Sequence, residues 1–372
     1  MLVDWLIVGA GFTGAVLAER IASQLGQTVL VIDRRDHIAG NAFDEYDAHG
    51  VLIHRYGPHI FHTNSAKVWD YLSQFTEWRP YYHHVLALVE GKLVPLPFNF
   101  NSLRMLFPER LANRIEHKLL RQYGFEAKIP ILKLRQSEDP DIRVLAEYVY
   151  HHVFHGYTVK QWGMSPEELD ASVTSRVPIR LSYDNRYFQD TYQAMPKQGY
   201  SALFRRLLSH KNIKIALKTD YTEIAGMIRY QRMIYTGPID EFFGYSYGCL
   251  PYRSLDFRFE HHAIPQLQPV AQINYPSNHQ YTRTTEFKLL TGQSHAATTI
   301  AVETPQAYQP GLNDPYYPIP CDENGRLYQQ YVREAQAYSN IIFAGRLAEY
   351  KYYNMDQVVA RALKIFETEI AR

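Results

Sequence analysis

The first apolar run of the chain, Trp5–Val8, has the length of a buried strand, and residues 15–23 then show the apolar spacing of a helix. Gly9, Gly11 and Gly14 lie between the two at G-x-G-x-x-G spacing. This order lets the strand turn sharply, lets the backbone approach a pyrophosphate, and lets helix pack against strand. It predicts a dinucleotide bound at the N-terminus of the helix.

A second apolar run supports this interpretation. Residues 28–33 form a predicted strand that ends in Asp33, 24 residues after Gly9. A carboxylate at that place can accept hydrogen bonds from a ribose 2′-OH. The motif does not separate NAD from FAD.

The rest of the pattern predicts more than a nucleotide fold. Residues 83–96 alternate around Glu90-Gly91 as a hairpin, residues 101–161 are helical, and residues 254–301 contain strands of period two. A strand at 340–346 and a helix at 355–369 end the chain. The fold class is therefore α/β: a Rossmann-like FAD-binding domain with a helical insertion domain and an antiparallel β-sheet domain.

FAD is favoured over NAD because both chain ends look like parts of one nucleotide fold. The strand-glycine-helix order occurs at residues 5–24 and again at residues 341–369. A flavin is long, and its ring can use a second helix N-terminus to stabilise negative charge in the reduced state.

We expect three domains, two of them discontinuous. The FAD-binding domain comprises 1–78, 197–240 and 318–372; the helical domain comprises 98–178, with a mobile substrate loop at about 164–178; and the sheet domain comprises 79–97, 179–196 and 241–317.

Composition narrows the class of protein. The 372 residues carry 39 basic and 38 acidic side chains, which gives no electrostatic case for nucleic acid or a membrane surface. The two cysteines form no metal spacing or disulfide framework, and we expect neither a signal peptide nor a membrane span. A cytoplasmic protein is expected. The 30 tyrosines suit sugar and nucleotide pockets, although part of that number is ordinary core and surface.

Two histidines flank a Gly-Pro turn. His59 and His62 have H-x-x-H spacing, but no third ligand or acidic cluster lies near them in the sequence. A metal pair, a polar contact to a bound ring and purely structural histidines all stay open, and no metal site is predicted.

The remaining candidates favour a nucleotide sugar. In the segment 155–163, Tyr157 and Trp162 can stack on a base or a sugar, and Thr158 can hydrogen-bond. Arg176 and Arg283 lie on separate segments, and a pair of guanidinium groups suits a diphosphate. Each arginine alone could equally form a surface ion pair.

Together these stretches resemble the UDP-galactopyranose mutase family of the bacterial type. The matching segments are VGAGFTG, RRDHIAGNA, YGPHIFHT, GYTVKQWG, SRVPIR, YDNRYFQDTYQAMPKQGY, YTRTTE and FAGRLAEYKYYNMDQVV, in order from residue 8 to residue 359. Ala39 is a departure, because the family usually has a second glycine before Gly40 and Asn41.

The resemblance implies a set of site residues. The catalytic residues would be Arg176, Arg283 and His59. The substrate would contact Phe154, Tyr157, Thr158, Trp162, Arg176, Tyr187, Asn274, Arg283, Tyr317, Tyr352 and Asn354. The cofactor would contact Gly9, Gly11, Phe12, Thr13, Gly14, Asp33, Arg34, Gly40, Asn41, His59, Arg346, Tyr352 and Met355.

The resemblance also implies an activity. The family interconverts UDP-galactopyranose and UDP-galactofuranose for polysaccharide biosynthesis, with N5 of reduced FAD as nucleophile on galactose C1 and UDP as leaving group. It further implies a homodimer and an external reductant, for which NAD(P)H is the candidate. The alternatives are an FAD-dependent oxidoreductase of amine-oxidase-like fold and a nucleotide-sugar binding protein with a structural FAD.

Overall fold

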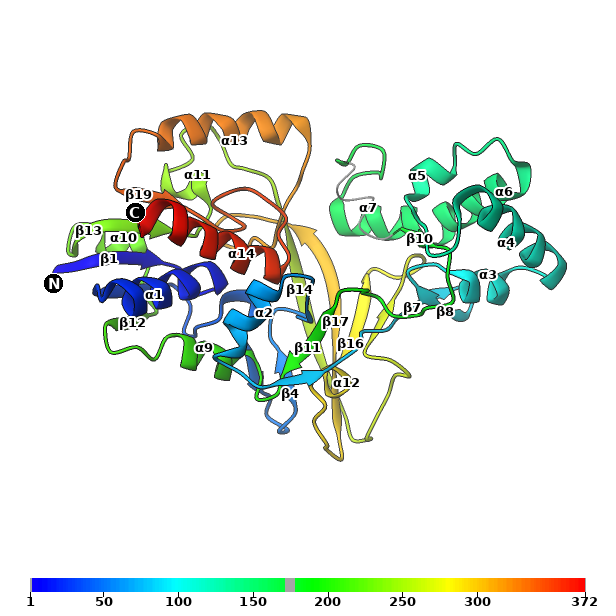
Figure 1. The fold of residues 1–372 in the computed structure, drawn as a ribbon, viewed down its shortest axis with the longest axis horizontal. Coiled ribbons are helices and arrows are strands. Elements are labelled where there is room, and N and C mark those ends of the chain that lie inside the picture. Colours follow the sequence, from blue (N-terminus) through cyan, green and yellow to red (C-terminus); the bar gives the residue numbers. More distant parts are fainter. Residues whose placement is uncertain (1, 171–177, 372) are drawn as a thin grey trace.

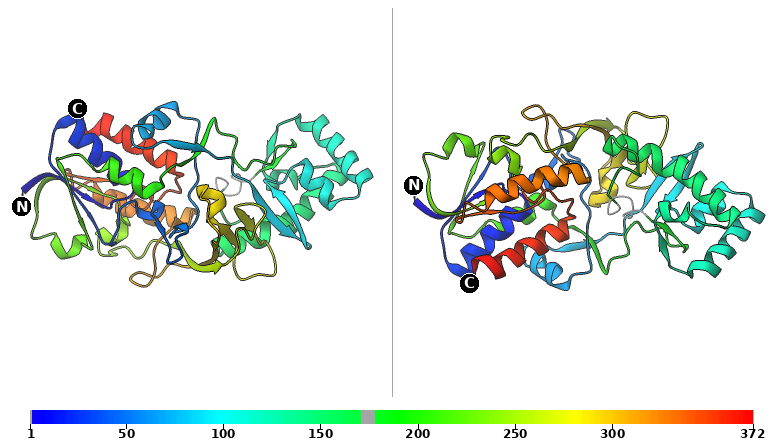
Figure 2. Two further views of the ribbon diagram at one scale, coloured as in Figure 1. Left: turned by 90° about the horizontal axis from the view of Figure 1, so that it is seen from below. Right: turned by 90° about the horizontal axis from the view of Figure 1, so that it is seen from above.

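The computed structural model describes residues 2–170 and 178–371. Three groups of elements follow one another along the long axis of the molecule (Figure 1). A parallel sheet with its helices lies at the end that holds both termini, a large sheet lies in the middle, and a cluster of helices lies at the far end. The views from below and above keep the same three parts apart (Figure 2).

Both ends of the chain contribute to one five-stranded parallel sheet, as the sequence predicts. Residues of α1 (Phe12–Leu25) and α14 (Met355–Ile365) share the hydrophobic core that covers it. The strand order is β12 (Ile213–Leu217), β2 (Val29–Asp33), β1 (Leu2–Val8), β13 (Arg229–Tyr235) and β19 (Ile341–Phe343).

The central sheet has seven strands and is antiparallel in all but one pair. The exception is the parallel pair β15–β7, whose strands come from segments far apart in the chain. The order is β18 (Tyr317–Pro318), β14 (Tyr252–His262), β17 (Thr298–Ala307), β16 (Arg283–Glu286), β15 (Gln272–Asn274), β7 (Val85–Val89) and β8 (Lys92–Leu96).

The helical part begins at a capping box in which the Asn99 side chain accepts from the N–H groups of Asn101 and Ser102. The sequence GYTVKQWG forms its last helix and ends at Gly163 in a left-handed conformation. The helices are α3 (Phe100–Leu106), α4 (Glu109–Tyr123), α5 (Ile131–Leu134), α6 (Pro140–Val149), the π-helix η2 (Tyr150–His155) and α7 (Gly156–Trp162). Between α4 and α5, β9 (Lys128–Ile129) pairs with β10 (Ile179–Arg180).

Shorter elements connect these parts. The strand β11 (Tyr192–Pro196) pairs with β5 (Phe61–Thr63) and β6 (Trp78–Pro80), so segment 179–196 also joins a second, three-stranded sheet. The domain boundaries given above stay a prediction. The other elements are β3 (Asp44–Tyr46), β4 (Leu52–His54), η1 (Gly40–Ala42), α2 (Ala66–Ser73), α9 (Tyr200–Leu207), α10 (Tyr221–Ile224), α11 (Ile239–Phe242), α12 (Phe287–Thr291), α13 (Asp322–Ala335) and η3 (Phe366–Ile370).

Within residues 2–170 and 178–371, no helix combines the length and the apolar composition that crossing a membrane would require.

A buried carboxylate beside the parallel sheet gives a test of pH dependence. Asp240 in α11 accepts a hydrogen bond from Leu250 N–H through Oδ2, while its buried Oδ1 has no partner among the described residues. Burial raises the pKa of Asp240 from 3.8 to about 6. The folded state therefore favours the protonated form, and stability is lost as the pH rises through about 6.

We accordingly expect Asp240→Asn to raise the stability at pH 8 by on the order of 2 kcal/mol. Below about pH 4 this gain in stability should disappear, because Asp240 of the wild-type protein is then protonated in both the folded and the unfolded state. Thermal unfolding at the two pH values measures this, with the exposed Asp256→Asn as control. An equal effect of Asp240→Asn at both pH values would contradict the interpretation.

Candidate functional site

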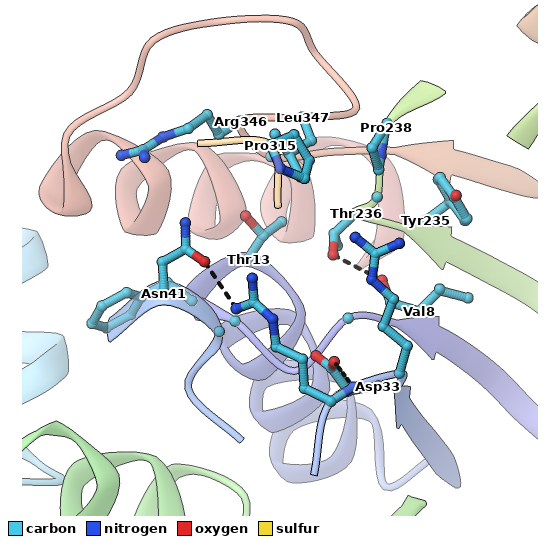
Figure 3. Close-up of a pocket in the computed structure, with 18 of the residues that line it drawn as sticks. Val8, Thr13, Asp33, Asn41, Tyr235, Thr236, Pro238, Pro315, Arg346 and Leu347 are labelled. Atoms are coloured by element: carbon cyan, nitrogen blue, oxygen red, sulfur yellow. Dashed lines mark hydrogen bonds between the residues drawn. The ribbon is translucent and has the colours of Figure 1, made fainter. Parts of the chain in front are cut away.

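A cavity of about 270 Å³ lies at the carboxyl ends of β1, β2 and β13. In Figure 3, Val8, Asp33 and Thr13 lie on one side of it, while Pro315, Leu347 and Arg346 lie across from them. This is the place where parallel α/β sheets bind nucleotides. The cavity thus coincides with the site that the glycine motif predicts.

Three glycines in or beside the cavity wall have no room for a side chain. At Gly9, which has φ of +107°, a Cβ would come within 2.0 Å of Thr236 Oγ1. At Gly14 it would come within 2.0 Å of the Gly9 carbonyl oxygen, so helix and strand are in close contact there. At Gly345 it would come within 2.6 Å of Thr13 Oγ1. The turn and the helix packing therefore require glycine, as predicted.

Gly11 differs, because a Cβ there would meet only Gly40 Cα at 3.8 Å and would otherwise enter open space. Gly40 has φ of +54°, and a Cβ on it would lie 3.0 Å from Gly11 Cα. The two backbones thus leave an open cradle beside Gly11, where the motif predicts the pyrophosphate of a dinucleotide. Ala39 precedes it at φ of +77° and is buried, which is a conformation that glycine would adopt with less strain.

The ribose end of the cavity contains charged groups that already have partners. Asp33 accepts from Ala10 N–H at 2.8 Å and from Arg35 N–H at 2.9 Å. Its carboxylate is therefore oriented by the backbone, and contact with a ribose stays a prediction. Arg35 reaches Asp314 at 3.2 Å, and Arg34 reaches Glu241 at 3.3 Å. The Arg35–Asp314 pair joins the segment before Pro315 to the cavity wall, whereas the Arg34–Glu241 pair joins that wall to α11.

His59 lies at the opposite end of the cavity, near the N-terminus of α14. Its Nδ1 lies 2.9 Å from the Gly57 carbonyl oxygen. Burial and, to a smaller degree, the neighbouring His54 lower the pKa of His59 to about 3. The imidazole is thus neutral near pH 7 and presents Nε2 as an acceptor, because Nδ1 donates its proton to the carbonyl.

The structure brings together most of the residues predicted for the cofactor. Gly14 and Tyr352 lie outside the cavity lining, Gly14 because it packs against β1. The residues that line it are Gly9, Gly11, Phe12, Thr13, Asp33, Arg34, Gly40, Asn41, His59, Arg346 and Met355.

The central sheet presents a transverse row of side chains on one face. Strand register sets Asn274 opposite Arg283, Arg283 opposite Glu303, and Glu303 opposite Phe257. Directly opposed residues project from the same face of a sheet. Gly57, two residues before His59, fits against this row, since a Cβ on it would lie 2.8 Å from the Phe257 ring. The row therefore adjoins the His59 end of the cavity.

Arg283 and Glu303 form an ion pair in which the carboxylate is buried and the guanidinium is 19% exposed. Arg283 Nε donates to Glu303 Oε2 at 2.7 Å, and the Glu303 side chain is only 2% exposed. Burial alone would lower the pKa of Arg283, but the Glu303 carboxylate raises it well above its ordinary value. Among the described residues, the Nη groups of Arg283 make no hydrogen bond, so they can meet an anion in the fork geometry.

Tyrosines surround this guanidinium. Tyr157 and Tyr317 both interact electrostatically with Arg283, and Tyr157 also interacts with Tyr187. Burial raises the pKa of Tyr157 and of Tyr317 above the ordinary value, so both hydroxyls stay protonated and can donate. The arrangement can therefore surround an anionic group with one cation and several hydroxyl donors.

An aromatic cluster joins this group to the cavity. The Trp162 ring lies 5.7 Å from that of Tyr352, which lies 5.1 Å from that of Tyr317. The Arg346 guanidinium lies 5.6 Å from each of the two tyrosine rings. Asn354 caps α14 in a capping box. The predicted sugar and diphosphate residues thus lie between the sheet, α7 and the His59 end of the cavity.

Three further predicted residues remain. Arg176 lies outside the described residues, as do residues 171–177 of the mobile loop predicted at about 164–178. Phe154 packs against the core of the helical part, and Thr158 lies on the first turn of α7 beside Tyr157.

His62 does not join His59, because its Nδ1 lies 2.9 Å from Asp190 Oδ2 and its ring stacks on Phe188 at 3.6 Å. Among the described residues, no group of three or more ligating side chains could hold a metal ion.

Several residues of the site are missing from the sequence interpretation. Glu303 ends the predicted strand 298–303, but only the pairing of β17 with β16 sets it opposite Arg283. Asp314, Pro315 and Tyr316 come from an irregular segment with no motif. The alternation of strand 298–303 could have placed Glu303 on one face of the sheet, whereas its partner depends on pairing that the sequence does not specify.

Comparison with known proteins decides between the remaining interpretations. Residues 152–352 match the family model described as UDP-galactopyranose mutase, and residues 7–75 match that of an NAD(P)-binding Rossmann-like domain. A probable UDP-galactopyranose mutase of Klebsiella pneumoniae is 40% identical over 364 residues, which are 96% of this chain and 92% of that protein. The chain belongs to the UDP-galactopyranose mutase family. The family is one of flavin-dependent isomerases.

Two further comparisons concern a related mutase and the fold. A dTDP-fucopyranose mutase of Escherichia coli is 33% identical over 96% of each chain. The crystal structure of a reduced UDP-galactopyranose mutase matches with a TM-score of 0.76 over 100% of this chain and 94% of that chain, at 15% identity, and so shows the shared fold. The expected fold and a flavin cofactor are thereby confirmed, and the family makes the chain an isomerase, while the individual cofactor-binding residues stay a prediction.

Proposed function

We propose that this chain interconverts UDP-galactopyranose and UDP-galactofuranose. The observation that carries the proposal is the Arg283–Glu303 pair, surrounded by tyrosine hydroxyls and adjoining the flavin end of the nucleotide cavity. A cation held there can bind the diphosphate of UDP while UDP leaves the sugar and until it returns. That the substrate is a sugar nucleotide is inferred from the family.

The flavin, when bound in its reduced form, supplies a nucleophilic N5 to galactose C1. Arg283 holds the diphosphate and stabilises the negative charge that develops on UDP as it leaves. Tyr317, Tyr352 and Tyr187 donate hydroxyl hydrogen bonds to the same phosphates. Tyr157 stacks on the base, and Trp162 limits the space around the sugar. Neutral His59 lies at the flavin end, where it accepts a hydrogen bond without adding positive charge.

This assignment is better supported than the amine-oxidase-like alternative. An oxidoreductase would use the nucleotide fold in the same way, but its reaction would not need an arginine held by a buried carboxylate and surrounded by hydroxyl donors. A reductant of the NAD(P)H type, a homodimer, a cytoplasmic location and a role for Arg176 in closing over the diphosphate complete the proposal.

The substrate is tested by product analysis. Chemically reduced protein is incubated separately with UDP-galactofuranose and with dTDP-fucofuranose, and the nucleotide sugars are separated by chromatography. We expect conversion of the first to the pyranose form at a rate at least about 10-fold above that of the second. Faster turnover of the dTDP sugar would reassign the substrate, and bleaching of oxidised flavin by an amine would favour the oxidoreductase.

A further inference from the structure

A buried chain of polar side chains lies behind the proposed substrate site. Tyr81 Oη lies 3.1 Å from His83 Nδ1, the His83 ring hydrogen-bonds the Gln272 side chain, and Gln272 Nε2 donates to Asn274 Oδ1 at 2.9 Å. His83, Gln272 and Asn274 are 2%, 5% and 6% exposed. Polar side chains that are this deeply buried need hydrogen-bond partners, so these four residues hold one another in a defined arrangement.

The hydrogen bonds determine which atom of each side chain donates and which accepts. Burial lowers the pKa of His83 to about 3, so the ring is neutral and has one donor and one acceptor nitrogen. Because the Gln272 NH₂ group is turned toward Asn274 Oδ1, the Gln272 carbonyl is the group that accepts from the His83 ring N–H. Nδ1 is then the acceptor and Tyr81 the donor. The NH₂ group of the Gln272 amide then faces the other way, and it donates a hydrogen bond to Asn274 Oδ1.

This order leaves the NH₂ of Asn274 as the only group that its amide can present. Among the described residues, Asn274 Nδ2 has no acceptor, and it is not among the fully buried polar atoms without a partner. Asn274 projects from the same face as Arg283, directly across the strand pair. His83 supports Tyr187 as well, because its carbonyl accepts from Tyr187 N–H at 2.7 Å.

We propose that Gln272 and His83 are positioning residues that fix the Asn274 amide as a hydrogen-bond donor to a carbonyl oxygen of the bound nucleobase. The inference rests on the proposed nucleotide-sugar site and adds to it the mechanism by which the site recognises the base. Without Gln272, the Asn274 amide could rotate, and half of its orientations would present an oxygen to the base carbonyl.

A double-mutant cycle on UDP binding tests this in the flavin-loaded protein. Asn274→Ala and Gln272→Leu should each weaken UDP binding by about 5- to 10-fold, the effect of one lost hydrogen bond. If Gln272 acts through Asn274, the double variant should bind UDP no more weakly than Asn274→Ala alone. The KM for UDP-galactopyranose should rise in parallel, while kcat stays within about twofold.

Gln268→Leu is the matched control, because Gln268 is equally buried but donates to the carbonyls of Val270 and Ala271 and does not touch Asn274. Its effect on UDP binding should be the same with and without Asn274. Asn274→Asp is a second probe, since it keeps the oxygen that faces Gln272 and removes the donor. It should weaken UDP binding at least as much as Asn274→Ala.

The outcomes are distinct. Unchanged UDP binding in Gln272→Leu or Asn274→Asp, or effects of Gln272→Leu and Asn274→Ala that multiply in the double variant, would overturn the inference. Coupled losses of UDP affinity in a protein that does not isomerise UDP-galactose would support the inference and reject the proposed function. A wild-type protein that does not bind UDP would reject both.

Discussion

Arg283→Ala is expected to lower kcat/KM for UDP-galactopyranose by about 10²- to 10³-fold, as the loss of a preorganised charged donor to a leaving group does. Most of the loss should appear in kcat, because the charge on UDP develops in the transition state. Arg283→Lys should recover only part of the activity, since an ammonium cannot make the fork contact. Steady-state kinetics of the reduced protein measure both variants.

The same variant should also lose stability. Removal of Arg283 leaves Glu303 buried without a cation, which costs about 3–5 kcal/mol when a buried pair is broken. Replacement of both residues, in Arg283→Met with Glu303→Gln, should recover the stability but not the activity.

Arg258→Ala on β14, two strands away from Arg283 in the same sheet, is the control, because that side chain is 69% exposed. Near-normal turnover by Arg283→Ala, or activity restored in the double variant, would contradict the role given to Arg283.

Gly11→Val should abolish flavin binding while the protein still folds. Gly11 has φ of −79° and ψ of −173°, which valine can adopt, and its Cβ would contact only Gly40 Cα at 3.8 Å. The side chain would instead enter the cradle that receives the pyrophosphate. We expect at least a 100-fold loss of FAD affinity, measured by the absorbance of the purified protein and by FAD titration.

The unfolding temperature separates this effect from misfolding. Without flavin, Gly11→Val and the wild-type protein should unfold within a few degrees of each other, and only the wild type should be stabilised by added FAD. Gly325→Ala in α13 serves as control, because a Cβ there meets nothing within 4 Å. Normal flavin content in Gly11→Val would show that the cofactor does not use the cradle.

The nucleotide fold could be predicted from sequence because its signals are local. The glycine turn after Val8 and the apolar strand before Asp33 depend on backbone conformation and burial, which neighbouring residues determine. The helix α13 (Asp322–Ala335) is not among the predicted elements, although Leu327, Tyr328 and Tyr331 recur at helical spacing and pack in one cluster. Its first half is polar and contains Gly325, which weakens a helix signal that depends on local propensity.

For the substrate site, the residues alone suggest candidates such as Tyr157, Trp162 and Arg283, and the family resemblance supplies the rest of the set. The Arg283–Glu303 pair and the position of Asn274 opposite Arg283 depend on strand register across β15, β16 and β17. A shift by one residue would move each of these side chains to the other face of the sheet. Sequence spacing does not fix the register, so Glu303 and Gln272 became visible only in the folded structure.

The central claim is that a redox cofactor serves an isomerase, and turnover as a function of flavin oxidation state tests it most directly. The same preparation is assayed with UDP-galactopyranose after reduction by dithionite and after reoxidation in air, with the flavin state followed by absorbance. The account predicts interconversion of the two sugar nucleotides by the reduced protein and at least about 100-fold slower turnover after reoxidation. Equal rates in both states would contradict it.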